Sequence, residues 1–178
     1  PLVPLADVPC LTMARNVSTR FVSQYYFTRE HQGHPLSRMA MLPALSPAQV
    51  VQALRALHPL QSVPVLWQWG SLKEEMSKAG VAKLHPSSDD PRVVRARKAA
   101  LNTAKTRLGR STCVVGRQES EAETEEQIKA WLPWLYKPPS TRPRLKKSTH
   151  GTKLTAEQEQ ALMRVMPEEY EAMDFMVQ

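Results

Sequence analysis

Apolar residues recur at helical spacing in several separate segments of the chain. The most distinct is 47–57, in which Val50, Leu54 and Leu57 fall on one face. The Ser-Pro-Ala-Gln sequence at 46–49 precedes it and forms a capping box with proline in the first helical position. The pattern predicts a helix over 47–57.

Other capping boxes predict further, shorter helices. The Ser-Leu-Lys-Glu sequence at 71–74 is a second box, and Gly80 supplies a C-terminal glycine, so a helix of about two turns is expected between them. Two successive boxes, starting at Ser120 and Thr124, lie in a glutamate-rich stretch before Pro133. Either is able to start a helix there, because glutamates are favourable at a helix N-terminus.

The longest predicted helix starts at Asp90-Pro91, continues to Leu108 and stops at Gly109. Its apolar residues share one face at about 100° per residue. They are Val93, Val94, Ala96, Ala100, Leu101, Ala104 and Leu108. Arg97 and Arg107 fall within this apolar sector, so each must find polar partners or extend its head group to solvent.

A last helix is predicted from the box at 155–158, with an apolar face at Leu162 and Met166. Pro167 either ends this helix or restarts it. The apolar stripe continues beyond it at Tyr170, Met173 and Met176.

The remaining segments lack a sustained helical period. Residues 1–45 contain five prolines and are expected to be extended, with at most one short helix or strand near 21–27. Residues 112–115 have the composition of a short strand. The expected fold class is mostly α, with short helices joined by extended proline-rich segments in an irregular, non-compact architecture.

Composition supports this irregular picture. The chain has 178 residues, 42% of them hydrophobic, and contains 15 prolines against 6 glycines. One modest body is therefore expected rather than two full domains. We divide the chain into an extended N-terminal arm at 1–45, a helical body at 46–136, a basic proline-rich arm at 137–153 and an acidic helical segment at 154–178.

Positive charge is concentrated in two segments. The chain carries a net charge of +7, which favours polyanionic partners. Residues 91–110 hold seven basic residues and no acid, and residues 137–153 hold six and no acid. The last 25 residues reverse this balance, with six acids and one arginine.

These segments supply the candidate site. The predicted phosphate contacts are Arg92, Arg95, Lys98, Lys105, Arg142, Arg144, Lys146 and Lys147. The predicted partner-binding anchors just before the basic arm are Trp131, Trp134 and Tyr136. A solvated basic face, an acidic protein or anionic lipid would suit the same charges, and a flexible linker would suit the proline-rich segment.

Signals for catalysis, cofactors and metals are absent from the sequence. The glycines do not approach the spacing of a phosphate-binding loop. His31 and His34 lie three apart without a second ligand cluster, and Cys10 and Cys113 fit neither a zinc pattern nor a disulfide framework. We therefore expect no enzyme, cofactor, metal or small-molecule substrate, and a reducing environment.

Membrane and targeting signals are equally weak. The apolar stretch at 56–72 is interrupted by two prolines and a glycine, so no transmembrane segment is expected. Residues 13–29 are rich in arginine and serine without acids, a composition typical of a mitochondrial transit peptide. The expected location is the mitochondrial matrix.

Together these features favour a structural subunit of a mitochondrial ribosome that contacts rRNA and neighbouring proteins and is not a free monomer. An accessory subunit of a respiratory-chain complex or of ATP synthase is the alternative, because both settings suit small, basic, proline-rich chains. An isolated RNA-binding module is a third hypothesis and would fold alone.

Overall fold

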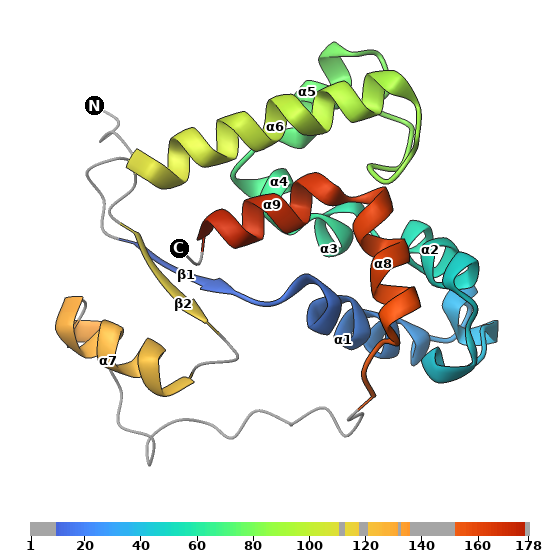
Figure 1. Ribbon diagram of the computed structural model, residues 1–178, viewed down its shortest axis with the longest axis horizontal. Helices are drawn as coiled ribbons and strands as arrows, with labels where there is room; N and C mark the ends of the chain where they lie inside the picture. Colours follow the sequence, from blue (N-terminus) through green and yellow to red (C-terminus); the bar gives the residue numbers. More distant parts are fainter. Residues whose placement is uncertain (1–9, 111–112, 118–120, 132, 136–151, 177–178) are drawn as a thin grey trace.

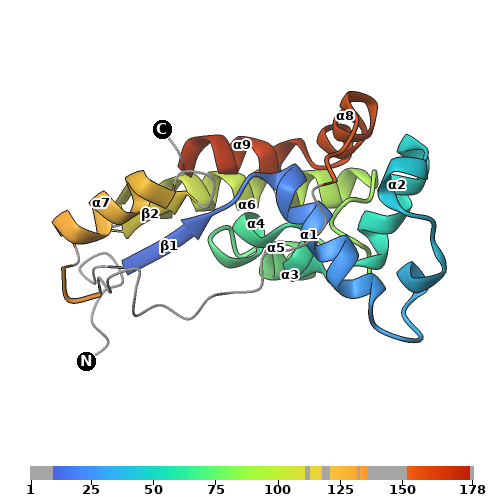
Figure 2. The same ribbon diagram turned by 90° about the horizontal axis from the view of Figure 1, so that it is seen from below.

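The computed structural model describes residues 10–110, 113–117, 121–131, 133–135 and 152–176. Most of these residues are helical, as the fold class predicted, and two short strands accompany the helices (Figure 1). The helices gather into one body, while the strands and α7 lie to one side of it (Figures 1 and 2).

The predicted helices are present close to their expected bounds. They are α2 (Pro47–Ala56), α5 (Leu72–Lys78), α6 (Pro91–Arg110), α7 (Glu121–Trp131), α8 (Ala156–Val165) and α9 (Pro167–Met176). Both parts of the capping box are formed at Ser46 and at Thr155. The box expected at Ser71 is not formed, because that residue adopts a left-handed conformation with φ of 53° and its side chain makes no capping bond.

The expectation of an extended segment over 1–45 is wrong for much of its length. Helix α1 (Val17–Arg29) starts at Asn16, whose side chain accepts bonds from the N–H groups of Ser18 and Thr19. Two 3-10 helices follow, η2 (Pro35–Arg38) and η3 (Leu42–Ala44). Residues 1–9 lie outside the described residues.

Two short helices occupy the apolar stretch at 56–72. Helix α3 (Pro59–Ser62) starts at a capping box formed by His58 and Gln61, and α4 (Pro64–Gln68) follows directly. Each has proline in its first position, where the missing N–H removes no hydrogen bond of the helix. The prolines that interrupt the apolar stretch therefore start these helices.

The core forms where the N-terminal and C-terminal helices meet the middle of the chain. Helix α8 packs on α2, and α9 packs on α4 and α6, so the acidic C-terminal segment belongs to the body. Side chains from all three regions are fully buried, namely Tyr25, Leu36, Leu42, Leu54, Leu66, Leu72, Leu162 and Met166.

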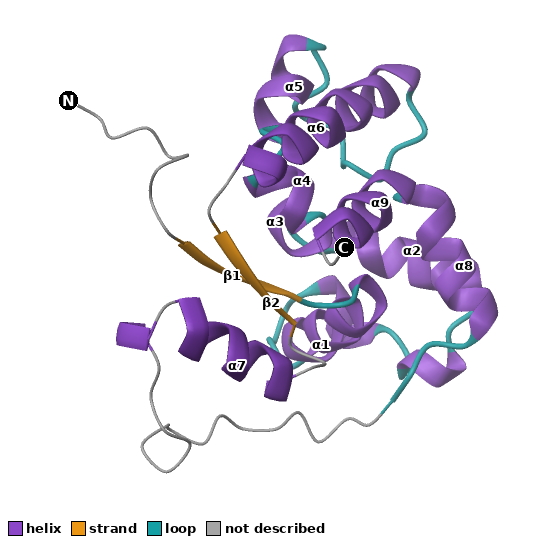
Figure 3. Cartoon of the chain, turned by 60° about the vertical axis from the view of Figure 1, so that its left-hand side comes forward, coloured by secondary structure: helices purple, strands orange, loops and turns teal. Residues whose placement is uncertain are grey.

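Strands β1 (Cys10–Ala14) and β2 (Cys113–Arg117) form a parallel pair, with Cys10 aligned to Cys113 and Ala14 to Arg117. Helix α7 packs along β2 (Figure 3), and η4 (Pro133–Leu135) follows it. The short strand expected at 112–115 is thus present at 113–117, and its partner is a strand that the sequence did not predict.

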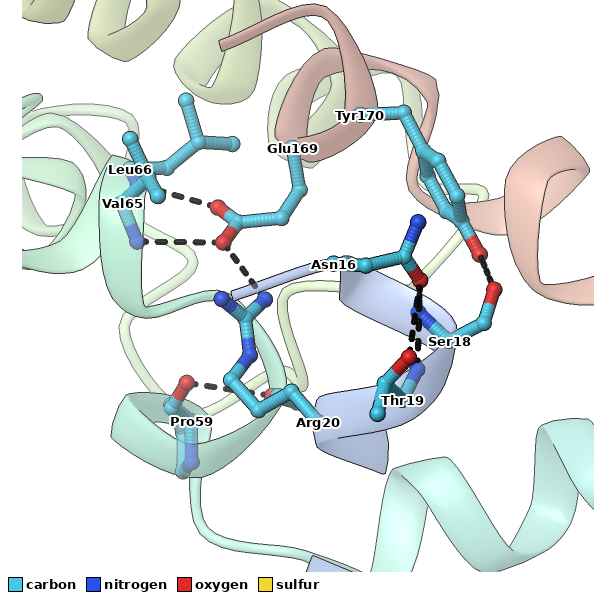
Figure 4. Close-up of polar contacts among 10 residues, drawn as sticks. Asn16, Ser18, Thr19, Arg20, Pro59, Val65, Leu66, Glu169 and Tyr170 are labelled. Carbon is cyan, nitrogen blue, oxygen red and sulfur yellow. Dashed lines mark hydrogen bonds and ion pairs between the residues drawn. The ribbon is translucent and has the colours of Figure 1, made fainter. Parts of the chain in front are cut away.

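Glu169 on α9 lies at the centre of a buried polar network (Figure 4). Its side chain is fully buried and accepts bonds from the N–H groups of Val65 and Leu66, each 3.0 Å long. Arg20 on α1 donates to the same carboxylate at 2.9 Å. Burial raises the pKa of Glu169, while Arg20 and the two N–H groups oppose that rise. The carboxylate thus caps α4, whose N-cap residue Val63 makes no side-chain capping bond.

A second buried polar side chain joins helix α8, near the C-terminus, to the segment that precedes α2. The Gln158 amide nitrogen on α8 donates to the carbonyls of Leu42 and Leu45, at 2.9 and 2.7 Å. Leu42 begins η3 and its carbonyl also accepts the N–H of Leu45, which directly follows η3, so α8 holds both ends of this 3-10 helix. These two hydrogen bonds explain why the irregular segment that contains η3 packs in a fixed place.

We expect the Glu169→Ala substitution to lower the free energy of unfolding by about 3–5 kcal/mol, because it leaves the partly buried guanidinium of Arg20 and two buried N–H groups without their acceptor. Urea unfolding of the full chain measures the loss. Glu171→Ala on the same helix is the matched control, since its carboxylate is 56% exposed and pairs at the surface. Its expected cost is about 0–1 kcal/mol, and equal losses in the two variants would contradict the assigned role of Glu169.

Candidate nucleic-acid interface

Helix α6 carries four of the eight predicted phosphate contacts, and its position depends on its apolar face. Val93, Ala96, Ala100, Leu101 and Ala104 are buried against the body. The backbone of the α4–α5 connection approaches α6 so closely that a Cβ at Gly70 would lie 2.5 Å from the Ala100 carbonyl oxygen. This contact requires glycine at position 70. The opposite face of α6 remains on the outside of the body.

The two arginines in the apolar sector find partners as predicted. Arg97 is 3% exposed and pairs with Glu168 on α9 at 2.8 Å. It also donates to the Pro86 carbonyl in the preceding loop. Arg107 donates to the Trp69 carbonyl and the Ser71 hydroxyl. Both therefore anchor α6 to the body.

Arg92 is tied to the start of its own helix. Its guanidinium donates to both oxygens of Asp90, at 3.1 and 2.8 Å, and its backbone N–H donates to the same carboxylate. These bonds to Arg92 lower the pKa of Asp90 to about 2. A phosphate would have to replace a carboxylate to bind Arg92, so this residue is a weaker candidate than predicted.

Lys105 also has an acidic partner. Its ammonium lies 2.6 Å from Glu171 of α9 and 5.8 Å from the centroid of the Phe175 ring. Both contacts lie at the surface, where an ion pair contributes little to stability. Lys105 thus mainly links α6 to α9.

Arg95 and Lys98 form the strongest part of the candidate interface. Both side chains are exposed, and they lie three residues apart on the outer face of α6. Within the described ranges, neither has an ion pair or a side-chain hydrogen bond. Their two positive charges are therefore available to an external anion.

The other predicted basic contacts cannot be placed. Arg142, Arg144, Lys146 and Lys147 lie outside the described residues. The same holds for Tyr136, one of the predicted anchors.

Of the predicted aromatic anchors, Trp134 is the one whose side chain is described. It lies in η4 and is 69% exposed, which is unusual for so large an apolar side chain. Trp131 is the last residue of α7. The exposure of Trp134 is compatible with the predicted role of an anchor.

The acids of α9 neutralise cations of the body itself. Glu168, Glu169 and Glu171 pair with Arg97, Arg20 and Lys105 respectively. This use of the C-terminal acids was not predicted from the sequence. The arginines within apolar sectors were the available signal, because a buried cation requires an acidic partner.

The loop before α6 contains a histidine in an unusual environment. His85 Nδ1 accepts the backbone N–H of Ser87 at 3.2 Å and contacts its hydroxyl, while Arg55 donates to that hydroxyl and to the Ser87 carbonyl. Burial lowers the pKa of His85, and the nearby Arg55 charge adds to the decrease. The loop is thus built around a neutral imidazole.

This arrangement predicts a loss of stability in mild acid. The unfolded chain takes up a proton at His85 near pH 6.5, whereas the folded chain resists until a lower pH, so stability falls as pH drops through about 6.5. We expect His85→Asn to flatten the decline in unfolding free energy between pH 7.5 and 5.5, measured by urea titration. One group contributes a slope of at most about 1.4 kcal/mol per pH unit.

His31→Asn provides the control, because this histidine lies in the exposed turn after α1. It should keep the wild-type pH dependence. An unchanged decline in the His85→Asn variant would show that another group causes it.

The described residues contain no cluster of three or more His, Cys, Asp or Glu side chains that could hold a metal ion. No helix in the same part of the chain has both the length and the apolar character needed to cross a membrane. Comparisons of the chain with protein-family models, curated proteins and solved structures find no match. The outer face of α6 is therefore the feature from which a function is inferred.

Proposed function

We propose that the protein is a non-catalytic structural subunit of a large assembly in the mitochondrial matrix, and that this assembly is a ribosome in which the chain contacts rRNA and neighbouring proteins. The observation that carries the proposal is the exposed pair Arg95 and Lys98 on a helix that the body holds rigidly. Such a helix presents cations to phosphates in a fixed geometry, and each phosphate contact releases counterions.

The distribution of acids supports a nucleic acid over an acidic protein. The acids nearest α6 already pair with the body's own cations, so the outer face keeps an excess of positive charge. The chain as a whole carries +7. The basic segment at 137–153, which lacks acids, would add to this attraction without base specificity.

Protein neighbours would bind elsewhere on the chain. Trp134, Phe27 and Met41 are exposed, and aromatic and methionine side chains are enriched at protein interfaces. The proposed subunit therefore contacts RNA through α6 and proteins through these residues. An accessory subunit of a respiratory complex would instead set α6 against acidic protein or anionic lipid.

Sedimentation of the tagged chain from mitochondrial lysate tests the assembly. We expect it to migrate with ribosomal subunits and to shift to lighter fractions after RNase digestion. A reporter subunit of a respiratory complex, followed in the same gradient, should ignore RNase. Migration with that reporter, unchanged by RNase, would overturn the ribosomal proposal in favour of the alternative.

The role of α6 is tested by RNA binding as a function of salt. We expect the double variant Arg95→Ala, Lys98→Ala to reduce the slope of log affinity against log salt by about 1.4–1.8, because two phosphate contacts are lost. Filter binding of the full chain to a structured RNA measures the slope.

The double variant Arg38→Ala, Arg164→Ala removes the same charge from exposed positions on η2 and α8. It should leave the slope close to that of the wild type. If the two double variants behave alike, binding reflects net charge alone and α6 is not the interface.

A further inference from the structure

The outer face of α6 is a continuous polar stripe. Exposed polar side chains recur every three or four positions along most of the helix, so they lie on one side of it. They are Arg92, Arg95, Lys98, Asn102 and Thr106. At about 1.5 Å per residue the stripe is about 21 Å long. It therefore extends over several nucleotides of a nucleic-acid strand.

Two hydrogen-bonding side chains follow the cations Arg95 and Lys98 along the stripe. The Asn102 amide is exposed and, in the part of the chain that the structure describes, has no hydrogen-bond partner. The Thr106 hydroxyl donates to the Asn102 carbonyl at 2.9 Å, which leaves its oxygen lone pairs free to accept. Both side chains therefore suit a ribose 2′-hydroxyl, which is a donor and an acceptor.

The stripe lacks the side chains that hold single-stranded RNA. Unpaired bases are held mostly by stacking on aromatic rings, and residues 91–110 contain no aromatic residue. The Phe175 ring of α9 approaches α6 at Lys105 but is partly buried. An unpaired base therefore finds no fully exposed ring on this side of α6.

Double-stranded RNA presents the groups that the stripe is able to contact. Its wide, shallow minor groove exposes 2′-hydroxyls between two phosphate backbones, and proteins recognise it mainly by shape and by these groups. A rigidly held helix suits so regular a surface. The body fixes α6 through the buried pair of Arg97 with Glu168 and through the close backbone approach at Gly70.

Anionic lipid fits the stripe less well. A helix that lies in a membrane surface buries an apolar face in the lipid. The apolar face of α6 is buried in the body instead, at Val93, Ala96 and Ala100 among others. Lipid would therefore meet the polar side chains of the stripe alone.

We propose that the outer face of α6 binds double-stranded RNA without reading its base sequence. Arg95 and Lys98 contact phosphates, while Asn102 and Thr106 contact 2′-hydroxyls across the minor groove. This inference rests on the proposed function, in which α6 contacts RNA, and it names the form of RNA that the helix takes. Duplex RNA should also be preferred to duplex DNA, which lacks the 2′-hydroxyl.

The first test measures how the double variant Arg95→Ala, Lys98→Ala binds two RNAs at one salt concentration. The probes are a duplex of about 20 base pairs and an unstructured single strand of equal length, added to the full chain. We expect a loss of at least about tenfold on the duplex and of less than about threefold on the single strand, because the helix contributes mainly to duplex binding.

Two outcomes of this test have different meanings. Equal losses on the duplex and the single strand would overturn the inference and leave α6 as an RNA contact. If the variant Arg38→Ala, Arg164→Ala binds both RNAs as the α6 variant does, the proposed function fails as well.

The second test removes the groups assigned to the sugars. We expect Asn102→Ala, Thr106→Ala to weaken binding to duplex RNA by about fivefold or more and to change binding to duplex DNA of the same sequence by less than about twofold. Alanine favours a helix, so α6 stays formed. The control Gln52→Ala, Gln160→Ala removes exposed amides from α2 and α8 and should leave both affinities unchanged. An equal loss on RNA and DNA, or no loss on either, would overturn the contact with 2′-hydroxyls.

Vesicles of phosphatidylcholine and phosphatidylserine provide the competing surface. The wild type should bind them no more tightly than the variant Arg95→Ala, Lys98→Ala does. Vesicle binding that depends on Arg95 and Lys98, together with duplex binding that does not, would overturn the inference in favour of lipid.

Discussion

The buried carboxylate of Glu169 is the constraint on which the arrangement of the helices depends. It accepts bonds from two N–H groups of α4 and from Arg20 of α1, and so joins three helices that are far apart in sequence. A buried ionised group is tolerated only where its partners hold a fixed geometry. Helix α4 has no side-chain cap of its own, so its start is defined by a residue about a hundred positions later. The short helices of this chain thus depend on tertiary contacts rather than on local stability.

The same helix explains where charge remains on the surface. Three acids of α9, Glu168, Glu169 and Glu171, neutralise cations on α1 and α6. Arg95 and Lys98 are exposed on α6, and neither pairs with an acid within the described residues. The cationic surface is therefore a consequence of how the core pairs its charges, and composition alone does not locate it.

Local signals predicted the helices that begin with complete caps. The boxes at Ser46 and Thr155 placed α2 and α8 to within about one residue, and the apolar face of α6 required partners for Arg97 and Arg107 that the structure contains. Helix α1 was predicted only as a short helix or strand near 21–27, because its β-branched and aromatic residues favour strands locally, although Val17, Phe21 and Tyr25 recur every four residues. The network of Glu169 and the pairing of Lys105 with Glu171 depend on tertiary contacts that leave no local pattern. Arg92 instead pairs with Asp90 of its own helix start.

The size of the core changes which property would identify the protein as a subunit of a large assembly. Irregular, proline-rich chains are commonly ordered by their partners, and the sequence led us to expect a chain that folds only within its assembly. The structure instead contains a continuous core in which α1, α4, α6 and α9 bury their apolar faces on one another. A body of this kind is able to unfold cooperatively by itself, so independent folding no longer separates a subunit from an isolated RNA-binding module. The two classes differ in the surfaces they need. Only a subunit requires a second, protein-binding surface on the same rigid body, in addition to the outer face of α6.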